Sequence, residues 1–207
     1  MYLNELFNFV IGTSKTYNID ESHSLGHSME VYYYANILYE NEVKLGKISK
    51  EKKKLIDICV ILHDMCDKKY MDENIGIENI SDFLKSKIND GEINIVKDII
   101  TSMSYSKVKE YGYPDLGENM DIYHIVRQAD ILAAYDFERC IIYGMMKYHD
   151  SYKEVFKKAE KLFNERVLMH IYDGTFVSEY ALGLGKILHE KAVERIMKLK
   201  EYNKFYD

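Results

Sequence analysis

Apolar residues recur every three or four positions along most of this chain, which is the spacing of one face of an α-helix. Similar stripes predict helices at residues 2–11, 76–88, 92–103 and 151–168. The clearest stripe lies at 176–200 and consists of Val177, Ala181, Leu184, Leu188, Ala192, Ile196 and Leu199. No segment alternates apolar and polar residues as a half-buried strand does. The pattern therefore predicts an all-α protein, a compact helical bundle.

Three further stripes of helical spacing each bring a chemically active side chain to the edge of the predicted core. These side chains are His27, the adjacent pair His63 and Asp64, and Asp130. A buried imidazole or carboxylate costs free energy unless it is paired or bound to a metal. One divalent ion shared by the three helices would explain why each of them carries such a group.

Short irregular segments separate the predicted helices and contain most of the glycine and the single proline. We expect them at 12–22, 66–75, 104–119 and 169–175. With one proline and 11 glycines in 207 residues, no stretch reads as a linker between domains. We therefore expect one domain over 1–207, with a motif-bearing core at about 20–150 and C-terminal helices at about 151–207 packed on it.

Charge and cysteine content narrow the classes of partner and compartment. A formal net charge of −6 argues against binding to a nucleic-acid polymer or an anionic membrane, although locally concentrated positive charge would still suit a small anionic substrate. Three cysteines at irregular spacing indicate reduced thiols. The first ten residues lack a secretory pattern, and the apolar run LIDICVIL is too short to span a bilayer. We expect a soluble cytoplasmic protein, and the sequence gives no basis for an oligomeric state.

Two histidines and two aspartates form a ligand set for a borderline or hard divalent ion. Neutral imidazole nitrogens and carboxylate oxygens suit Mn, Co, Ni, Fe, Mg or Zn, and the set does not choose between them. Four protein ligands leave positions of an octahedral ion open to water or substrate. An open coordination position is what a metal-dependent hydrolase requires.

Four segments follow one another in an order that resembles the signature of HD-domain phosphohydrolases. They are ESHSLGHSMEV, LHDMCDKKY, MSYSK and RQADILAAYD. The resemblance covers roughly 20–200 and implies an all-α fold with His27 as the first metal ligand, His63 and Asp64 as adjacent ligands, and Asp130 as the last. It also implies hydrolysis of a phosphate ester or anhydride, with nucleotides as the expected substrate class. A His-Asp dipeptide by itself is not evidence for this family, since the chain also contains His149-Asp150, which we expect at the surface.

Two parts of the signature differ from the pattern common in this branch of the family. Glu30 stands where an arginine is usual, and Gln128, Ile131 and Ala133 surround the last ligand in place of more polar residues. The ligands themselves are kept. Because of these changes the sequence does not identify the substrate, nor whether phosphate or pyrophosphate is released. They also support one alternative function, a non-catalytic regulatory HD module that binds a nucleotide or metal.

The resemblance gives three lysines and one further aspartate a role in catalysis. Lys68, Lys69 and Lys107 would bring positive charge to the phosphate or the leaving group, where negative charge develops. Asp67 would orient one of these lysines or accept a proton. The catalytic set is therefore Asp64, which also binds the metal that activates a water, together with Asp67 and Lys68.

Two aromatic side chains near the motifs have both a functional and a structural interpretation. His23 lies four residues before His27, so it is either a substrate-binding pocket residue or a histidine of the turn before the helix. Tyr105 is predicted to bind substrate with Lys69 and Lys107, but it is one of 19 tyrosines and can equally be structural.

Two other chemistries are less consistent with the sequence. A nucleophilic pair of Cys66 with His63 needs a free base, whereas the metal occupies His63. A di-iron oxygenase needs further histidines between Asp64 and Asp130, where only His124 occurs. His124 precedes Asp130 by six residues, about 240° around a helix, so the two side chains point away from each other.

Overall fold

The structure, a computed structural model, describes residues 2–148 and 150–204, and every regular element within them is helical. This confirms the predicted fold class. The helices are α1 (Tyr2–Tyr17), α2 (Leu25–Lys44), α3 (Lys53–Leu62), α4 (Glu73–Leu84), α5 (Asp90–Ser102), α6 (Tyr105–Tyr111), α7 (Met120–Ala133), α8 (Phe137–Tyr148), α9 (Tyr152–Glu165) and α10 (Glu179–Asn203). Single 3₁₀ turns lie at Lys50–Lys52, Gly117–Asn119 and Val167–Met169.

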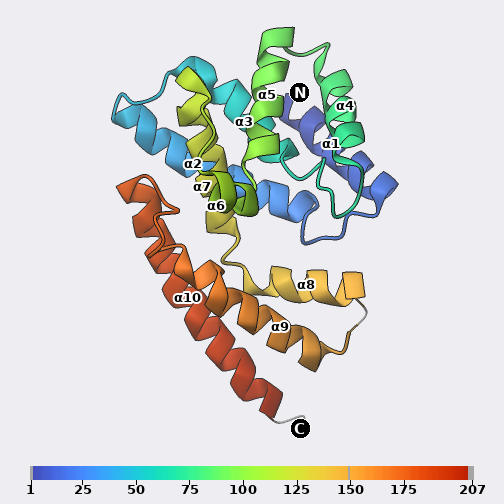
Figure 1. The fold of residues 1–207 in the computed structure, drawn as a ribbon, viewed down its shortest axis with the longest axis vertical. Coiled ribbons are helices and arrows are strands. Elements are labelled where there is room, and N and C mark those ends of the chain that lie inside the picture. Colours follow the sequence, from blue (N-terminus) through green and yellow to red (C-terminus); the bar gives the residue numbers. More distant parts are fainter. Residues whose placement is uncertain (1, 149, 205–207) are drawn as a thin grey trace.

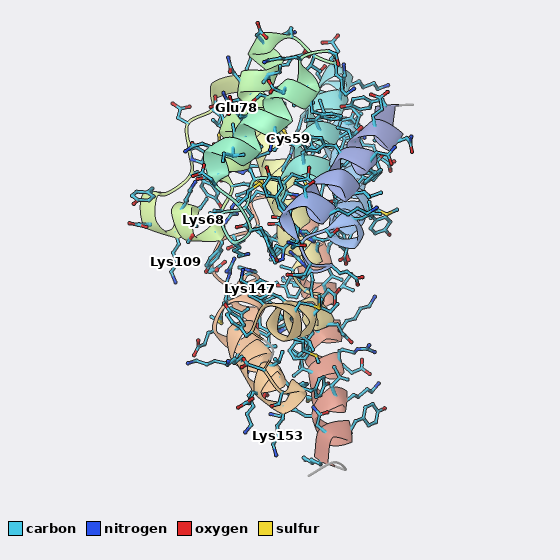
Figure 2. All side chains as sticks on the ribbon, turned by 90° about the vertical axis from the view of Figure 1, so that its right-hand side faces the viewer. Cys59, Lys68, Glu78, Lys109, Lys147 and Lys153 are labelled. Carbon is cyan, nitrogen blue, oxygen red and sulfur yellow. The ribbon has the colours of Figure 1, made fainter. Side chains whose placement is uncertain are left out.

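Helix α3 is the centre of the larger group of helices, α1 to α7, in the upper part of Figure 1. All of its residues from Leu55 to Leu62 are buried, because α1, α2, α5 and α7 pack around it. A helix that is apolar on every side is stable only when it is covered on every side. Cys59 accordingly lies among the packed upper helices in Figure 2.

Helices α8, α9 and α10 form the lower part of the molecule in Figure 1. Helix α8 packs on α9 through the ring of Phe137, whose centroid lies 5.3 Å from Phe156 and 5.0 Å from Phe163, both edge to face. Helix α10 contacts α8 and also α2 and α7. The C-terminal helices therefore pack on the helices that carry the motifs.

Two polar contacts hold α8 against the loops of the upper group. The Lys147 ammonium donates a hydrogen bond to the Lys69 carbonyl at 3.1 Å, and Arg139 donates one to the Ser22 carbonyl. Figure 2 shows Lys147 at the edge of the lower helices that faces Lys68 and the upper ones. The loops that precede α2 and follow α3 are thus both tied to α8.

One glycine lets α4 approach the turn that follows α3. A Cβ atom at Gly76 would lie 2.6 Å from both the Cα and the Cβ of Cys66, which is closer than carbon atoms can approach. Helix α4 therefore rests directly on the backbone two residues beyond Asp64. This close contact supports the position of the adjacent pair His63 and Asp64.

The helix pattern differs from the prediction most in three segments. Residues 12–17, predicted to be irregular, continue α1, because Thr13 and Ser14 are buried against the core despite their polarity. Residues 105–111, also predicted to be irregular, form α6, a helix with no buried residue and hence no apolar stripe to reveal it. Helix α8 was not predicted, since its stripe of Phe137, Ile141 and Gly144 is short and includes a glycine.

Two further sequence predictions concern the surface and the membrane. Asp150 is half-buried and its carboxylate forms an ion pair with Lys158 at 2.5 Å, whereas His149 lies outside the described residues. In the part of the chain that the structure describes, no helix has the length and apolar composition needed to cross a bilayer.

Candidate metal centre

Three helices that pack on one another bring the four predicted ligands to one point. His27 lies in the first turn of α2, and His63 caps the C-terminus of α3. Asp64 follows in the turn after α3, and Asp130 lies in the last turn of α7. Because α2, α3 and α7 contact each other pairwise, residues more than a hundred positions apart meet at the end of α3.

The four side chains approach one another through His27 Nε2 and His63 Nε2. These nitrogens lie 3.1 Å apart. His27 Nε2 lies 3.4 Å from Asp64 Oδ2 and 3.2 Å from Asp130 Oδ1. His63 Nε2 lies 3.4 Å from Asp64 Oδ1 and 3.6 Å from Asp130 Oδ1. His27, His63 and Asp64 form the tightest group, with all ligand atoms within 4.8 Å of one another, and Asp130 borders it.

These separations match those between ligands of a single ion. Nitrogen or oxygen ligands about 2.1 Å from one ion lie about 3.0 Å apart at right angles and about 3.4 Å apart at the tetrahedral angle. The separations between imidazole and carboxylate atoms fall around these values, at 3.2 to 3.6 Å. The residues present therefore fit a divalent ion.

Hydrogen bonding fixes the tautomer of His63 in the form that binds a metal. Its Nδ1 lies 2.9 Å from the Val60 carbonyl, which can only accept, so Nδ1 carries the proton. In the neutral ring Nε2 then directs its lone pair at the cluster. Asp64 Oδ2 is buried and has no hydrogen-bond partner. Asp64 Oδ2 is therefore an acceptor that no hydrogen-bond donor of the protein uses.

The electrostatics of the cluster favour positive charge. Burial by itself lowers the pKa of His63, but Asp64 and Asp130 outweigh burial and raise it to about 9. Burial likewise opposes ionisation of Asp64, yet His63, His23 and His27 lower its pKa to about 2. Burial lowers the pKa of His27. Two ionised carboxylates thus face this point, and a bound cation would balance their charge.

The cluster opens into a cavity of about 560 Å³ between the upper helices and α8 and α9. Nine of the ten residues assigned to the site from the sequence line it: His23, His63, Asp64, Asp67, Lys68, Lys69, Tyr105, Lys107 and Asp130. His27 lies behind them, fully buried. A small molecule in this cavity would therefore reach the metal ligands from one side only.

The cavity is basic although the chain as a whole is acidic. Seven lysines and arginines line it, namely Lys68, Lys69, Lys107, Lys158, Arg127, Arg139 and Arg166. Five carboxylates line it, namely Asp64, Asp67, Glu73, Asp130 and Asp136. Two of these carboxylates belong to the metal cluster. Positive charge is therefore concentrated where a small anionic substrate would bind.

His23 lines the cavity with Nε2 as the acceptor nitrogen of its ring. The hydroxyls of Ser22 and Tyr70 donate to the two carboxylate oxygens of Asp20, at 2.5 Å and 2.6 Å. They can then only accept from His23 Nδ1, which lies 2.6 Å and 3.1 Å from them. Burial, with help from Lys69 and Arg139, lowers the pKa of His23 to about 4, so the ring is neutral at pH 7. Its Nε2 accepts from the Lys69 ammonium at 3.0 Å.

The three predicted lysines differ in how firmly they are held. Asp67 accepts from the Lys69 backbone N–H at 2.8 Å and pairs with its ammonium at 3.2 Å. Lys107 donates to the Thr101 carbonyl at 2.7 Å and pairs with Glu73 at 3.2 Å. Lys68 is exposed at the rim. Lys69 and Lys107 are thus oriented by contacts within the protein, whereas Lys68 is exposed to solvent.

Several cavity residues were missed from the sequence. Arg139 and Tyr143 come from α8, which was not predicted, and Arg166 and His170 follow α9. Arginine and tyrosine occur in many helices for other reasons, and these positions lie outside the motifs. No signal in the sequence distinguishes them before the lower helices are placed against the upper ones.

Changed residues next to Asp130 have structural roles in this fold. Gln128 Oε1 accepts from the backbone N–H groups of Val177 and Ser178 at 2.8 Å and 3.1 Å, which fixes the start of α10. Ala133 is fully buried, whereas Ile131 is buried at the wall of the cavity. The departure at Gln128 therefore concerns the attachment of α10 and leaves the metal cluster intact.

Cys66 and His124 do not take part in the cluster. Burial raises the pKa of the Cys66 thiol to about 12, which opposes a thiolate nucleophile. His124 lines a separate pocket near the start of α10 and stacks edge to face with Tyr113 and Tyr123. The geometry thus gives Cys66 no role as a nucleophile and keeps His124 away from the cluster.

Comparisons of the chain with protein-family models, with curated proteins and with solved structures gave no match. The resemblance to HD-domain proteins accordingly rests on the motifs of this chain and on the geometry of His27, His63, Asp64 and Asp130.

Proposed function

We propose that this protein is a metal-dependent phosphohydrolase of the HD type that cleaves a phosphate ester or anhydride of a small molecule, with nucleotides as the substrate class. The observation that carries the proposal is the convergence of His27, His63, Asp64 and Asp130 at 3.1 to 3.6 Å. A cavity with more cationic than anionic side chains adjoins them. A cluster of buried ligands that faces a basic cavity suits an anionic substrate.

A divalent ion bound there would lower the pKa of a coordinated water to about 7 and neutralise charge on a phosphate oxygen. The chain supplies the remaining parts. Val60 holds His63 in the tautomer that binds, and Asp64 offers an oxygen that no protein donor uses. Lys69, oriented by Asp67, and the exposed Lys68 would bring positive charge to the leaving group.

The neutral His23 is placed to accept a proton at the cavity wall. Its Nε2 carries a lone pair, because Asp20 uses the hydroxyl protons of Ser22 and Tyr70 and thereby keeps the ring proton on Nδ1. Burial keeps the ring neutral at pH 7 by lowering its pKa to about 4. We assign His23 to substrate binding, with Lys69, Tyr105 and Lys107.

The test is hydrolysis by protein reconstituted with Mg²⁺, Mn²⁺, Co²⁺, Ni²⁺, Fe²⁺ or Zn²⁺. A panel of nucleoside mono-, di- and triphosphates and sugar phosphates is used, with released phosphate and pyrophosphate measured separately. We expect Asp64→Asn to lose bound metal and at least a hundredfold of the activity, because ligand loss exceeds the roughly 10–100-fold cost of losing a supporting contact. The matched control His124→Gln, in the separate pocket, should stay within twofold of the unmodified protein.

Two outcomes would count against the proposal in different ways. If the protein binds no divalent ion in equilibrium dialysis, the metal cluster is wrong and the proposal fails altogether. If it binds metal and nucleotide but hydrolyses nothing in the panel, the alternative of a regulatory HD module takes its place.

A further inference from the structure

Three arginines that line the cavity form no ion pair within the part of the chain that the structure describes. Arg127 lies on α7, Arg139 on α8, and Arg166 directly after α9. Among residues 2–148 and 150–204, no carboxylate lies at ion-pairing distance from any of them, whereas Lys69 and Lys107 have such partners. Ion pairs thus partly neutralise the lysine side of the cavity, whereas Arg166 and Arg139 interact with Asp130 and Asp136 only at longer range.

Arg127 is the most unusual of the three, because only 3% of it is exposed. One of its N–H groups donates to the Thr175 carbonyl at 3.2 Å, but its Nε is buried without a hydrogen-bond partner. A buried guanidinium with an unused donor and no carboxylate costs free energy in the empty protein. Such a group is stabilised when an anion enters the cavity beside it.

Arg166, Tyr105 and His170 lie together on the same side of the cavity. The Arg166 guanidinium lies over the Tyr105 ring, 4.2 Å from its centroid, and the His170 ring is 5.1 Å from Tyr105. His170 is 2% exposed, and its Nδ1 lies 3.6 Å from the Asp173 carboxylate without forming a hydrogen bond. Burial lowers the pKa of His170 to about 4 against the opposing charge of Asp173, and the charges of Arg166 and Arg127 act with burial, so both arginines are near it.

This arginine cluster borders the metal ligands. Arg127 precedes Asp130 by three residues on α7, a rise of about 4.5 Å along the helix. Asp130 is also the carboxylate whose charge reaches Arg166. Because Asp130 belongs to the candidate ligand set, a bound cation would offset its charge and weaken its attraction for Arg166.

We propose that Arg127 and Arg166, with Tyr105 and His170 beside them, form an anion subsite that takes a second charged group of the substrate. The inference rests on the proposed function, since the first charged group lies at the metal cluster and its lysines. The substrate class is then a phosphoanhydride such as a nucleoside diphosphate or triphosphate. A simple phosphate monoester would leave the arginine cluster without a ligand.

The test measures binding to the metal-free full chain, so it does not depend on the metal cluster. Inorganic pyrophosphate and inorganic phosphate are titrated in the presence of EDTA by isothermal calorimetry. We expect pyrophosphate to bind at least tenfold more tightly than phosphate. Arg166→Gln should weaken pyrophosphate binding about ten- to a hundredfold, as expected for loss of a charged hydrogen bond. The matched control Arg195→Gln, an exposed arginine on α10 paired with Glu138, should change it less than twofold.

A second variant and a second readout keep the test decisive. Arg127→Gln should weaken pyrophosphate binding as well. If the Arg127→Gln protein fails to fold, pyrophosphate binding by Arg166→Gln, a variant at an exposed residue, decides the test. Metal affinity of Arg166→Gln, measured without phosphate, should stay within threefold of the unmodified protein.

Equal effects of Arg166→Gln and Arg195→Gln on pyrophosphate binding, or equal affinity for phosphate and pyrophosphate, would overturn the subsite. Absence of hydrolysis with an intact pyrophosphate preference would overturn the proposed function alone.

Discussion

Helices α3 and α10 are built in opposite ways. Eight of the ten residues of α3 are buried, and the helix ends at the candidate metal ligand His63. Four of the 25 residues of α10 are buried, and its start is held by Gln128 and by the Ser178 cap. Core packing therefore fixes the position of the ligands, while the long outer helix is attached along one narrow stripe.

The same contrast separates the two sides of the cavity. The metal ligands come from α2, α3 and α7, which pack on one another, whereas Arg139 and Arg166 come from α8 and the end of α9. Substitutions among the first group should change stability and metal binding together. Substitutions of Arg139 or Arg166 should change stability less, which makes the arginine side the part of the cavity where specificity can vary.

The largest expected effect contrasts a buried with an exposed isoleucine. Ile58 on α3 is fully buried, and Ile187 on α10 is 51% exposed. Ile58→Ala should lower the free energy of unfolding by about 2–5 kcal/mol because it leaves a cavity in the core. Ile187→Ala should change it by less than about 0.5 kcal/mol. Urea unfolding followed by circular dichroism measures both, and similar losses would contradict the contrast between the helices.

A pair of glycines tests the close approach of α4 to the turn after α3. Gly76→Ala should destabilise the protein by about 1–3 kcal/mol, because the added Cβ would overlap Cys66. Gly12→Ala on α1, where the Cβ meets nothing within 4 Å, should instead stabilise it by about 0.5–1 kcal/mol. Thermal unfolding of the two variants should therefore shift in opposite directions. A Gly76→Ala protein as stable as the unmodified one would show that α4 does not rest on this turn.

A smaller effect is expected where α2 faces the turn between α7 and α8. Burial and the nearby Asp136, opposed by Arg139, raise the pKa of Glu30 to about 7. Below about pH 4 the side chain is protonated in both the folded and the unfolded state. As the pH rises to 7, the unfolded state ionises first, so the stability contributed by the folded, protonated form is lost.

Glu30→Gln removes this penalty. The variant should match the unmodified protein at pH 4.5 and exceed its stability at pH 8 by about 1 kcal/mol, a value reduced for solvent screening of a partly exposed group. Thermal unfolding at the two pH values measures the difference. A stability gain that is the same at both would mean that the pKa of Glu30 is not raised.

The sequence predicted the features that depend on local pattern. Stripes of helical spacing located most of the helices, and the spacing of His27, His63, Asp64 and Asp130 along them selected the four ligands that the fold brings together. Prediction failed where a helix lacks an apolar stripe, as in α6, or buries polar residues, as in the second half of α1. Burial of Thr13 and Ser14 depends on neighbours that are distant in sequence.

The amino-acid sequence by itself determined that the chain is helical and which polar groups lie at the edge of the core, because both follow from the periodicity of a single helix. Tertiary structure decided what meets those groups. Arg166 reaches the neighbourhood of Asp130, and Arg139 that of Ser22, only because α8 and α9 fold back on the upper helices. No local pattern encodes such contacts, since they arise from the packing of helices whose residues are far apart along the chain.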